Sequence, residues 1–350
     1  MSIVLITGSN GLVGSESVSF FSKKGFNVIG IDNNLRSFFF GKQASTLWVK
    51  NKLLKENKRF KHRNIDIRNY SKLEKIFQKY KKDISLTIHC AAQPSHDYGK
   101  NFPIVDFNVN ALGTLNLLEL VKIYCPDSPF IFMSTNKVYG DNPNRLKIIE
   151  KNNRLDLRLK DKYYKGIDEK FSIDSCTHSF FGVSKTYADL IVQEYGKNIG
   201  LKTVCFRGGC ITGPNHSGAQ LHGFLSYLVK QTLANKNYTL IGYKGKQVRD
   251  NLHSNDLVNC FWEFFKKPKK GEVYNIGGGR YSNCSILEAL KLVENLKKIK
   301  IKKNFIKTPR VGDHMWYVSD ISKFKKHYPK WKQNYNTKKI IEELINFNEN

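Results

Sequence analysis

A glycine-rich turn between an expected strand and an expected helix constrains the fold of this chain most. The segment Gly8-Ser-Asn-Gly11-Leu-Val-Gly14 follows an apolar run at Ile3–Thr7 and opens a helical pattern at Leu12–Lys24. Gly8 permits a tight turn, Gly11 lets the backbone approach a pyrophosphate, and Gly14 lets the helix pack on the strand. The free N–H groups at such a helix start attract phosphates. The pattern predicts a dinucleotide site; a purely structural strand-to-helix turn is the alternative.

Asp32 ends the second expected strand, Asn27–Ile31, eighteen residues after Gly14. A carboxylate at this place accepts hydrogen bonds from the ribose diol of adenosine and repels a 2′-phosphate, which favours NAD over NADP. The nearby Arg36 is the counter-argument, because an arginine can hold a 2′-phosphate. Asp32 as a plain turn residue is the other interpretation.

The remaining pattern alternates strands and helices. A third strand is expected to end at Ile65–Arg68, and further strands at Leu86–His89, Phe130–Met133 and Thr203–Phe206; helices are expected from Ser71 (as N-cap) to about Tyr80, at Asn108–Tyr124, at Phe180–Asn198 and at Thr337–Asn350. Alternation of this kind predicts an α/β fold with a doubly wound parallel Rossmann sheet and helices on both faces. We expect residues 1–207 to form the NAD-binding domain, with about 252–276 returning to it, and 208–350 to form mainly a smaller α/β substrate lobe. Residues 141–176 are expected to be a long connection or insertion.

Composition excludes several classes of protein. The chain has 350 residues, of which 40% are hydrophobic and 25% charged, which are globular values. The net charge is +28, but only 11 of the 58 basic residues are arginines and the lysines are scattered. Nucleic-acid binders usually concentrate their basic residues in one stripe, so we expect no nucleic-acid partner. The positive charge would still attract anionic small molecules such as sugar nucleotides.

The seven cysteines form no CxxC pair and show no metal-ligand spacing, so we expect no metal and a reducing compartment. No apolar run reaches about 18 residues, and the N-terminus carries no signal-peptide pattern. These observations predict a cytoplasmic protein without a membrane span.

Further motifs after the expected strands make a family resemblance specific. They are Asp66-Ile67, Ala91-Ala92-Gln93, Asn110 within Asn-Val-Asn-Ala-Leu-Gly-Thr, Ser134-Thr-Asn-Lys-Val-Tyr-Gly140, Phe206-Arg207, Gly213-Pro214, Arg249-Asp250 with His253 and Asp256, Asn275–Gly279, and Arg310-Val-Gly-Asp313. Over about residues 1–330 the chain resembles the extended short-chain dehydrogenase/reductase superfamily. Within it the chain is most similar to the NAD-dependent epimerases and dehydratases, and among these to the CDP-paratose 2-epimerase (CDP-tyvelose epimerase) group.

The resemblance implies NAD as the cofactor and assigns roles to residues of this chain. NAD would be bound by Gly8, Asn10, Gly11, Leu12, Val13, Gly14, Asp32, Asn33, Arg36, Asp66, Ile67, Ala91, Ala92, Gln93, Asn110, Ser134 and Lys185. The catalytic group would comprise Thr135, Lys185 and Lys137. The substrate would be bound by Ser95, Asn136, Phe181, Cys210, Arg249 and Arg310, the two arginines facing the diphosphate of a sugar nucleotide. Cys210 as a small buried side chain is the alternative, and Gln220, His222 and Tyr227 are further candidates for a sugar pocket.

One position departs from the family pattern. The family's catalytic pair is Tyr-x-x-x-Lys, and this chain has Phe181 four residues before Lys185. A phenyl ring neither accepts nor gives a proton. Three explanations are open: another base acts (Lys137 first, then Lys185, His178, Cys210 or Tyr164), turnover is lost while binding is kept, or Thr135 completes the proton path through a bound water.

The function expected from the resemblance is an NAD-dependent sugar-nucleotide epimerase that oxidises a sugar carbon transiently, with C2 of a CDP-sugar as the candidate. A dehydratase or oxidoreductase, and a non-catalytic protein that binds NAD and a sugar nucleotide, are the alternatives. Family members are commonly dimers through two helices, which correspond here to Asn108–Tyr124 and Phe180–Asn198, so we expect a homodimer.

Overall fold

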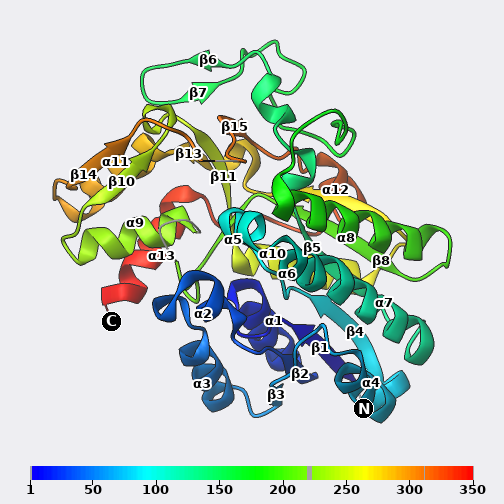
Figure 1. Cartoon of the computed structure of the whole chain (residues 1–350). Coiled ribbons are helices and arrows are strands. Elements are labelled where there is room, and N and C mark those ends of the chain that lie inside the picture. Colours follow the sequence, from blue (N-terminus) through cyan, green and yellow to red (C-terminus); the bar gives the residue numbers. More distant parts are fainter. Residues whose placement is uncertain (1, 219–222, 311, 350) are drawn as a thin grey trace. The chain divides into compact units, whose positions relative to one another are not determined.

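The chain folds into two compact units, each formed from several separate segments (Figure 1). The computed structural model describes residues 2–218, 223–310 and 312–349, so the predicted pocket residues Gln220 and His222 lie outside the described residues. The first unit comprises 1–138, 180–207 and 257–274; the second comprises 139–179, 208–256 and 275–350. Residues 139–179, which were expected in the NAD-binding domain, thus group with the second unit.

The first unit is built on a seven-stranded sheet in the order β12-β8-β5-β4-β1-β2-β3. Its strands are β1 (Ile3–Thr7), β2 (Asn27–Ile31), β3 (Phe60–Arg63), β4 (Ile84–His89), β5 (Phe130–Thr135), β8 (Thr203–Gly208) and β12 (Glu272–Ile276). The pairs β1–β2, β1–β4, β2–β3 and β4–β5 are parallel. The strand order reverses between β1 and β4, which is where doubly wound sheets bind ligands.

Helices cover both faces of this sheet, as predicted. Strand residues such as Leu5 and Phe132 form one apolar cluster with α4 (Tyr70–Tyr80), α7 (Gly113–Tyr124) and α8 (Ser179–Lys197). The opposite face packs on α1 (Leu12–Lys23) and α10 (Ser254–Lys266), where the Phe206 ring lies 5.3 Å from Phe261 and Phe21 lies 6.1 Å from Trp262, centroid to centroid. Shorter helical elements of this unit are α2 (Leu35–Phe40), η1 (Lys42–Ala44), α3 (Leu47–Glu56), η2 (Lys81–Asp83), α5 (His96–Asn101), α6 (Pro103–Phe107), η3 (Asn108–Leu112) and η4 (Asn136–Tyr139).

Three details of the predicted elements are wrong. The third strand is β3 at Phe60–Arg63, and the predicted Ile65–Arg68 is a turn, because the Asp66 carboxylate accepts from the Arg68 backbone N–H at 2.9 Å. Asn69, not Ser71, caps α4 through a hydrogen bond from Lys72 N at 3.0 Å. The helix predicted from Asn108 begins earlier, at Pro103, and contains a π-helical turn at η3.

The helical stretch Pro103–Tyr124 is long and apolar enough, by length and composition alone, to cross a membrane, and it is the one such stretch among the described residues. Most of its apolar window is buried against the sheet and neighbouring helices, as in the core helix of a globular unit.

The second unit holds the smaller sheets. Its strands are β6 (Ile149–Glu150), β7 (Leu155–Asp156), β9 (Cys210–Thr212), β10 (Tyr238–Ile241), β11 (Val248–His253), β13 (Asn283–Ser285), β14 (Lys303–Ile306) and β15 (Trp316–Tyr317), and its helices are η5 (Asn142–Arg145), α9 (Phe224–Leu233), η6 (Tyr243–Gly245), η7 (Gly279–Tyr281), α11 (Ile286–Lys297), α12 (Ser322–His327) and α13 (Thr337–Glu349). β11 is central and pairs with β9, β13 and β15.

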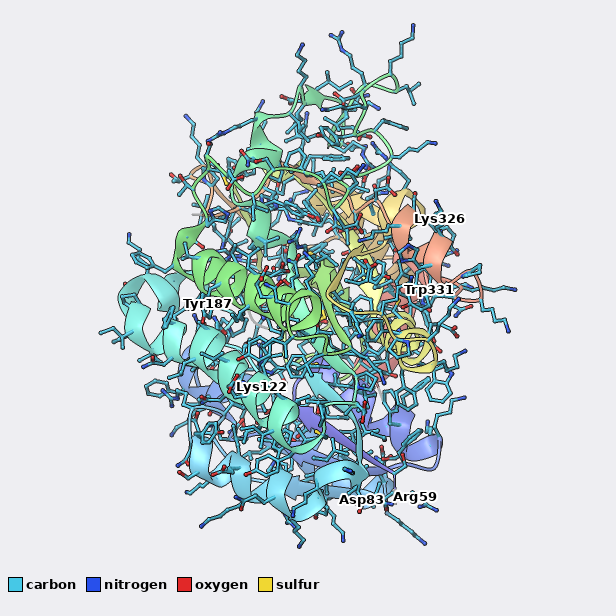
Figure 2. The ribbon with its side chains drawn as sticks, turned by 90° about the vertical axis from the view of Figure 1, so that its right-hand side faces the viewer. Arg59, Asp83, Lys122, Tyr187, Lys326 and Trp331 are labelled. Carbon is cyan, nitrogen blue, oxygen red and sulfur yellow. The ribbon has the colours of Figure 1, made fainter. Side chains whose placement is uncertain are left out.

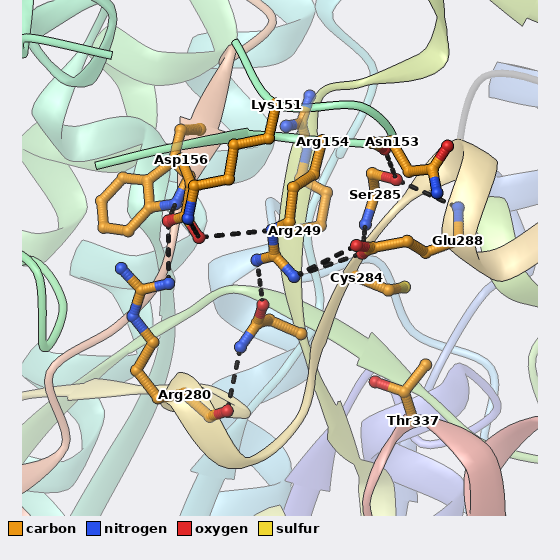
Figure 3. A network of polar contacts seen from close by, with 12 residues as sticks. Lys151, Asn153, Arg154, Asp156, Arg249, Arg280, Cys284, Ser285, Glu288 and Thr337 are labelled. Atoms are coloured by element: carbon orange, nitrogen blue, oxygen red, sulfur yellow. Dashed lines mark hydrogen bonds and ion pairs between the residues drawn. The ribbon is translucent and has the colours of Figure 1, made fainter. Parts of the chain in front are cut away.

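An ion-pair network fastens the β6–β7 hairpin within the second unit (Figure 3). The nearly buried Asp156 accepts from Arg280 at 2.8 Å and lies 3.3 Å from the Arg154 guanidinium. Arg154 also reaches Glu288 at 3.2 Å, and Glu288 forms a capping box with Ser285 at the start of α11. These contacts explain why the predicted insertion joins the second unit.

Candidate cofactor and catalytic site

The glycine turn has the geometry that the sequence predicts. Gly8 adopts a φ of +68°, and a Cβ there would lie 2.6 Å from the backbone N of Ala91, after β4. A Cβ on Gly14 would lie 2.0 Å from the Gly8 carbonyl oxygen. Gly11 is different, because the nearest atom to a Cβ there is 3.4 Å away. The fold itself therefore requires Gly8 and Gly14, whereas Gly11 leaves room for an approaching group beside Leu12 and Val13 at the start of α1.

Asp32 links this turn to the end of β2. One carboxylate oxygen accepts from the backbone N–H of Asn10 at 3.0 Å, and the other accepts from Asn34 N at 2.8 Å. Burial raises the pKa of Asp32, against the lowering effect of these two donors. The Asn10 side chain also lowers this pKa through a hydrogen bond; since a carboxylate offers about four acceptor positions, Asp32 keeps acceptor capacity for a hydroxyl. Arg36 lies with its guanidinium 4.8 Å from the centre of the Phe40 ring, and burial lowers its pKa to about 10.

Asp66 and Ile67 lie in the turn after β3. The Asp66 carboxylate receives two hydrogen bonds from the Arg68 guanidinium, at 2.9 and 2.6 Å, and one from Asn33 at 3.0 Å. Burial raises the pKa of Asp66, but the hydrogen bonds from Arg68 outweigh it and the net shift is downward. Ile67 is buried, and a Cβ on Gly113 of α7 would lie 2.6 Å from its Cδ1 atom. The hydrogen bond from Asn33 thus joins the end of β2 to the turn after β3.

A hydrogen-bond chain ties the ends of β1 and β4 to α7. Burial and the nearby Lys185 charge hold the pKa of His89 well below its usual value, so the imidazole is neutral. The Thr114 hydroxyl donates to the Asn110 carbonyl at 2.6 Å and therefore accepts from His89 Nε2 at 2.9 Å. His89 Nδ1 in turn accepts from the Thr7 hydroxyl at 2.7 Å. The backbone at Ala91 and Ala92, which follows β4, is held through this chain, since Ala91 N donates to Thr7 Oγ1 at 3.3 Å.

Gln93 and Asn110 form the buried core of a second network. The Asn110 amide oxygen accepts from Gln93 N at 2.8 Å, and its nitrogen donates to Gln93 O and to the Ser184 hydroxyl of α8, each at 3.0 Å. The Gln93 amide nitrogen donates to Asp106 at 2.5 Å and to Ser95 O at 2.8 Å. Asn110 lies in the π-helical turn η3, a feature that is frequent at functional sites. Both predicted cofactor residues therefore fix the loop after β4 onto η3 and α8.

Lys185 of α8 is only 3% exposed. Its ammonium donates to the Met133 carbonyl at 2.8 Å and lies 4.0 Å from the centre of the Phe132 ring in β5. Burial lowers the pKa of Lys185 to about 8. A buried cation beside the carboxyl end of β5 is well placed to donate hydrogen bonds to a polar ligand there.

Thr135, the last residue of β5, stands beside Lys137. The Thr135 hydroxyl accepts from the backbone N of Lys137 at 3.2 Å and lies 3.5 Å from the Asn136 side-chain oxygen. Asn136 and Lys137 begin η4. The Ser134 hydroxyl has a different environment, because it donates to the fully buried Asp189 at 2.5 Å.

Phe181 lies on α8 one turn before Lys185 and is 7% exposed. Its ring meets the imidazole of His96 edge to face, with centroids 5.0 Å apart and planes at 73°. His96 is the first residue of α5, whose N-cap is the predicted substrate residue Ser95. His96 is not among the predicted site residues, although it directly follows Ser95 in the segment after Gln93.

The other predicted substrate residues belong to the second unit. The Arg249 guanidinium pairs with Asp313 and donates to the Val248 carbonyl at 2.8 Å; its side chain lies near the network of Figure 3. Cys210 begins β9, beside Asn251 of β11, and is half-buried. Arg310 is half-buried after β14.

Two of the weaker candidate bases have other surroundings. The Tyr164 ring is covered by the Arg280 guanidinium at 3.9 Å. The other candidate, His178, has a ring nitrogen 3.7 Å from the Cys176 sulfur. Burial raises the pKa of the Cys176 thiol.

Comparison with known proteins decides the family. Residues 4–277 match the model of the NAD dependent epimerase/dehydratase family. The chain belongs to the NAD-dependent epimerase/dehydratase family. CDP-paratose 2-epimerase of Salmonella typhi is 33% identical over 328 residues, which cover 91% of each chain.

Solved structures of this family share the fold. UDP-glucuronic acid 4-epimerase from Bacillus cereus, in complex with UDP-glucuronic acid and NAD, superposes with a TM-score of 0.80, at 25% identity and over 99% of both chains. A mutant of that enzyme with a tyrosine replaced by phenylalanine, in complex with UDP-4-deoxy-4-fluoro-glucuronic acid and NAD, gives the same TM-score, identity and coverage. The predicted fold class, family and NAD cofactor are confirmed.

The residues of the first unit fit NAD. Gly11 offers an uncrowded backbone at the start of α1, and Asp32 keeps acceptor capacity at the end of β2. Both lie at the carboxyl ends of neighbouring parallel strands. Adenosine and pyrophosphate are the parts of NAD that this edge suits.

Proposed function

We propose that the protein is an NAD-dependent sugar-nucleotide epimerase acting on a CDP-sugar, with C2 as the reacting carbon. The observation that carries the proposal is the placement of Thr135 and Lys185 at the carboxyl end of β5, in a unit with the family's glycine turn. The similarity to CDP-paratose 2-epimerase over 91% of both chains supports the CDP-sugar.

The residues of the first unit would divide the work of binding NAD. The turn at Gly8–Gly14 would take the pyrophosphate on its N–H groups, Asp32 would accept from the adenosine ribose, and Lys185 would donate to the nicotinamide ribose. When bound, NAD accepts a hydride from a sugar carbon and returns it. Thr135 would hold the reacting sugar hydroxyl, and Arg249 and Arg310 would bind the diphosphate of the substrate.

A non-catalytic protein that binds NAD and a sugar nucleotide is the second candidate function. Phe181 favours it, since a phenyl ring cannot move a proton. The phenylalanine-bearing mutant of the Bacillus cereus epimerase is in complex with both kinds of ligand, so loss of a tyrosine hydroxyl is compatible with binding. A dehydratase is the alternative within the family; Lys137 after Thr135 supplies at most half of the acid–base pair that this chemistry uses.

We further propose that the protein is a cytoplasmic homodimer. Phe180, Val183, Tyr187 and Leu190 recur along one exposed face of α8, and the Tyr187 ring lies 5.8 Å from Phe107 of α6. Figure 2 labels Tyr187 on this helix and Lys122 on the neighbouring α7. Exposed apolar side chains on two helices that contact each other are suited to packing against a second copy of the chain. All seven cysteines are free, which supports a reducing compartment.

Incubation with sugar nucleotides tests the function. Purified protein is mixed with CDP-, UDP- and GDP-sugars in deuterated water, products are followed by NMR, and bound NAD by absorbance of its reduced form. A new epimer, with the CDP-sugar as the best substrate, is the expected result. Tight binding of both ligands without any product would instead establish the binding protein.

A further inference from the structure

We propose that His96 is the residue that takes and returns the proton of the sugar hydroxyl, at a site where Phe181 has no proton to exchange. This inference rests on the proposed epimerase function and names the acid–base group of that same site. The one observation that starts it is the contact between the two rings, with centroids 5.0 Å apart.

Proton exchange at this position requires a side chain that both accepts and donates protons near neutral pH. Imidazole is the side chain whose ordinary pKa lies closest to neutral, so it accepts and donates protons under the same conditions. A protonated lysine cannot accept a proton; Lys185, with a pKa of about 8, is mostly protonated at neutral pH and already donates to the Met133 carbonyl. Within the first unit, His96 is the imidazole in contact with Phe181; His89 is buried in the hydrogen-bond chain between Thr7 and Thr114.

Hydrogen bonds hold the segment that carries His96 in a fixed position. The Ser95 N–H donates to the Gln93 side chain at 2.5 Å, and the Ser95 hydroxyl accepts from Tyr98 N at 3.1 Å as the cap of α5. Gln93 is bound to Asn110, and Asn110 to Ser184 on the helix that carries Phe181. His96 is thus fastened to α8 by fully buried hydrogen bonds, and a fixed position is what proton transfer requires.

A neighbouring close approach holds α5 against α8 as well. A Cβ on Gly99 would lie 3.0 Å from an Asp106 oxygen and 3.2 Å from the backbone N of Phe181. Glycine at this position therefore lets α5 approach the start of α8, and the approach places the imidazole on the phenyl ring.

The step balances with the ligands of the proposed function. The O–H bond of the sugar hydroxyl breaks and its proton passes to a nitrogen of neutral His96, giving an imidazolium. Bound NAD would accept the hydrogen with its C–H electron pair as hydride, and the sugar carbonyl would form. After the keto-sugar presents its other face, hydride returns to carbon, and the His96 imidazolium returns the proton to oxygen. No further oxidant or base is consumed.

The experiment compares four proteins: wild type, H96N, F181Y and the double variant H96N/F181Y. A matched control is H327N, which removes the histidine at the end of α12. Turnover of the CDP-sugar is measured from about pH 5 to 9, and the Kd values of NAD and CDP-sugar are measured by calorimetry. The ¹⁵N resonances of the His96 ring are recorded with and without sugar nucleotide.

We expect H96N to lower kcat about 100-fold to 1,000-fold while both Kd values stay within about threefold, since general acid–base catalysis contributes on this scale. The limb of the pH profile that reflects an imidazole should disappear in H96N. Adding F181Y should restore at least about tenfold of the lost rate, because a phenol then exchanges the proton. The His96 ring resonances should shift when the sugar nucleotide binds, and H327N should match wild type.

Three results would overturn the inference. If H96N keeps the kcat and pH profile of wild type, another group such as Lys137 acts, although the epimerase function stands. An inactive wild type that F181Y makes active would identify the chain as a binding protein and His96 as inert. Absence of both turnover and NAD binding in every variant would instead remove the proposed function itself.

Discussion

The backbone N–H of Asn10 donates to the Asp32 carboxylate at 3.0 Å, which joins the glycine turn to the end of β2. The same carboxylate accepts from Asn34 N, so Asp32 is both a structural brace and the predicted partner of the adenosine ribose. A single side chain therefore sets the shape and the charge of the expected adenosine site.

The charge of Asp32 should select NAD over NADP. We expect wild type to bind NAD at least about tenfold more tightly than NADP, and D32N to reduce that ratio by about tenfold, because a neutral amide no longer repels a 2′-phosphate. Calorimetric Kd values for both dinucleotides measure the ratio. The control is D83N, which removes an exposed carboxylate labelled in Figure 2. An unchanged ratio in D32N would assign selectivity to Arg36 instead.

Substitution of Gly11 by alanine should weaken NAD binding, whereas substitution of Gly14 by alanine should destabilise the fold. A Cβ at Gly14 meets the Gly8 oxygen at 2.0 Å, so G14A should lower the free energy of unfolding by about 1–3 kcal/mol, as overpacking does. A Cβ at Gly11 meets nothing closer than 3.4 Å, so G11A should stay within about 1 kcal/mol of wild type but lose at least about tenfold in NAD affinity. Urea unfolding and calorimetry measure the two effects.

G25A is the matched control for these variants. A Cβ at Gly25 would meet nothing within 4 Å, although the φ of +91° makes alanine strained there. We expect it to destabilise the fold modestly and to leave NAD affinity unchanged. If G11A bound NAD as wild type does, the pyrophosphate would not rest on this turn.

Local sequence determines some of these features and not others. The strand Ile3–Thr7 and the turn at Gly8 were predictable because apolar runs and glycines act within a few residues. The strand Phe60–Arg63 was not predicted because its sequence, Phe-Lys-His-Arg, contains no apolar run. Only Phe60 of these four residues is buried. Asn69 replaced the predicted cap Ser71 because the two positions differ by only two residues, and a sequence pattern does not resolve that difference.

The site beyond the turns depends on contacts between distant residues. His96 and Phe181 are 85 residues apart, and no periodic pattern connects them. The hydrogen bond from Asn110 to Ser184 spans 74 residues. Residues 139–179 join the second unit through ion pairs such as Asp156–Arg280, 124 residues apart. Family resemblance selected the residue types, but only the fold brings them together.

The buried Lys185 should give the protein a pH-dependent stability. Its pKa of about 8 in the folded chain lies below the usual 10.5, so the unfolded chain binds more protons between these values. The free energy of unfolding should therefore rise with pH across that window, and the cost of burying the charge is complete below about pH 8. Relative to K185M, wild type should gain about 2 kcal/mol between about pH 7.5 and 9.5.

Urea unfolding of wild type and K185M at several pH values measures this gain. The other titrating groups are common to both proteins and cancel in the difference. K61M, which removes an exposed lysine, should show no such pH dependence. A constant difference between wild type and K185M would mean that the amine keeps its ordinary pKa and is hydrated.

The apolar face of α8 should control the oligomeric state. Val183 is 57% exposed on this helix, and Ile104 of α6 is 75% exposed. We expect V183E to convert a wild-type dimer into a monomer, because a carboxylate buried at the centre of an interface loses hydration without gaining a partner. Light scattering coupled to size-exclusion chromatography gives the mass of each protein.

The control L159E places the same charge at a leucine that is 76% exposed in the other unit and should remain dimeric. A wild type that is monomeric at all concentrations, or a V183E that stays dimeric, would contradict the proposed interface; because Val183 is outside the core, the substitution should leave the thermal midpoint within a few degrees of wild type.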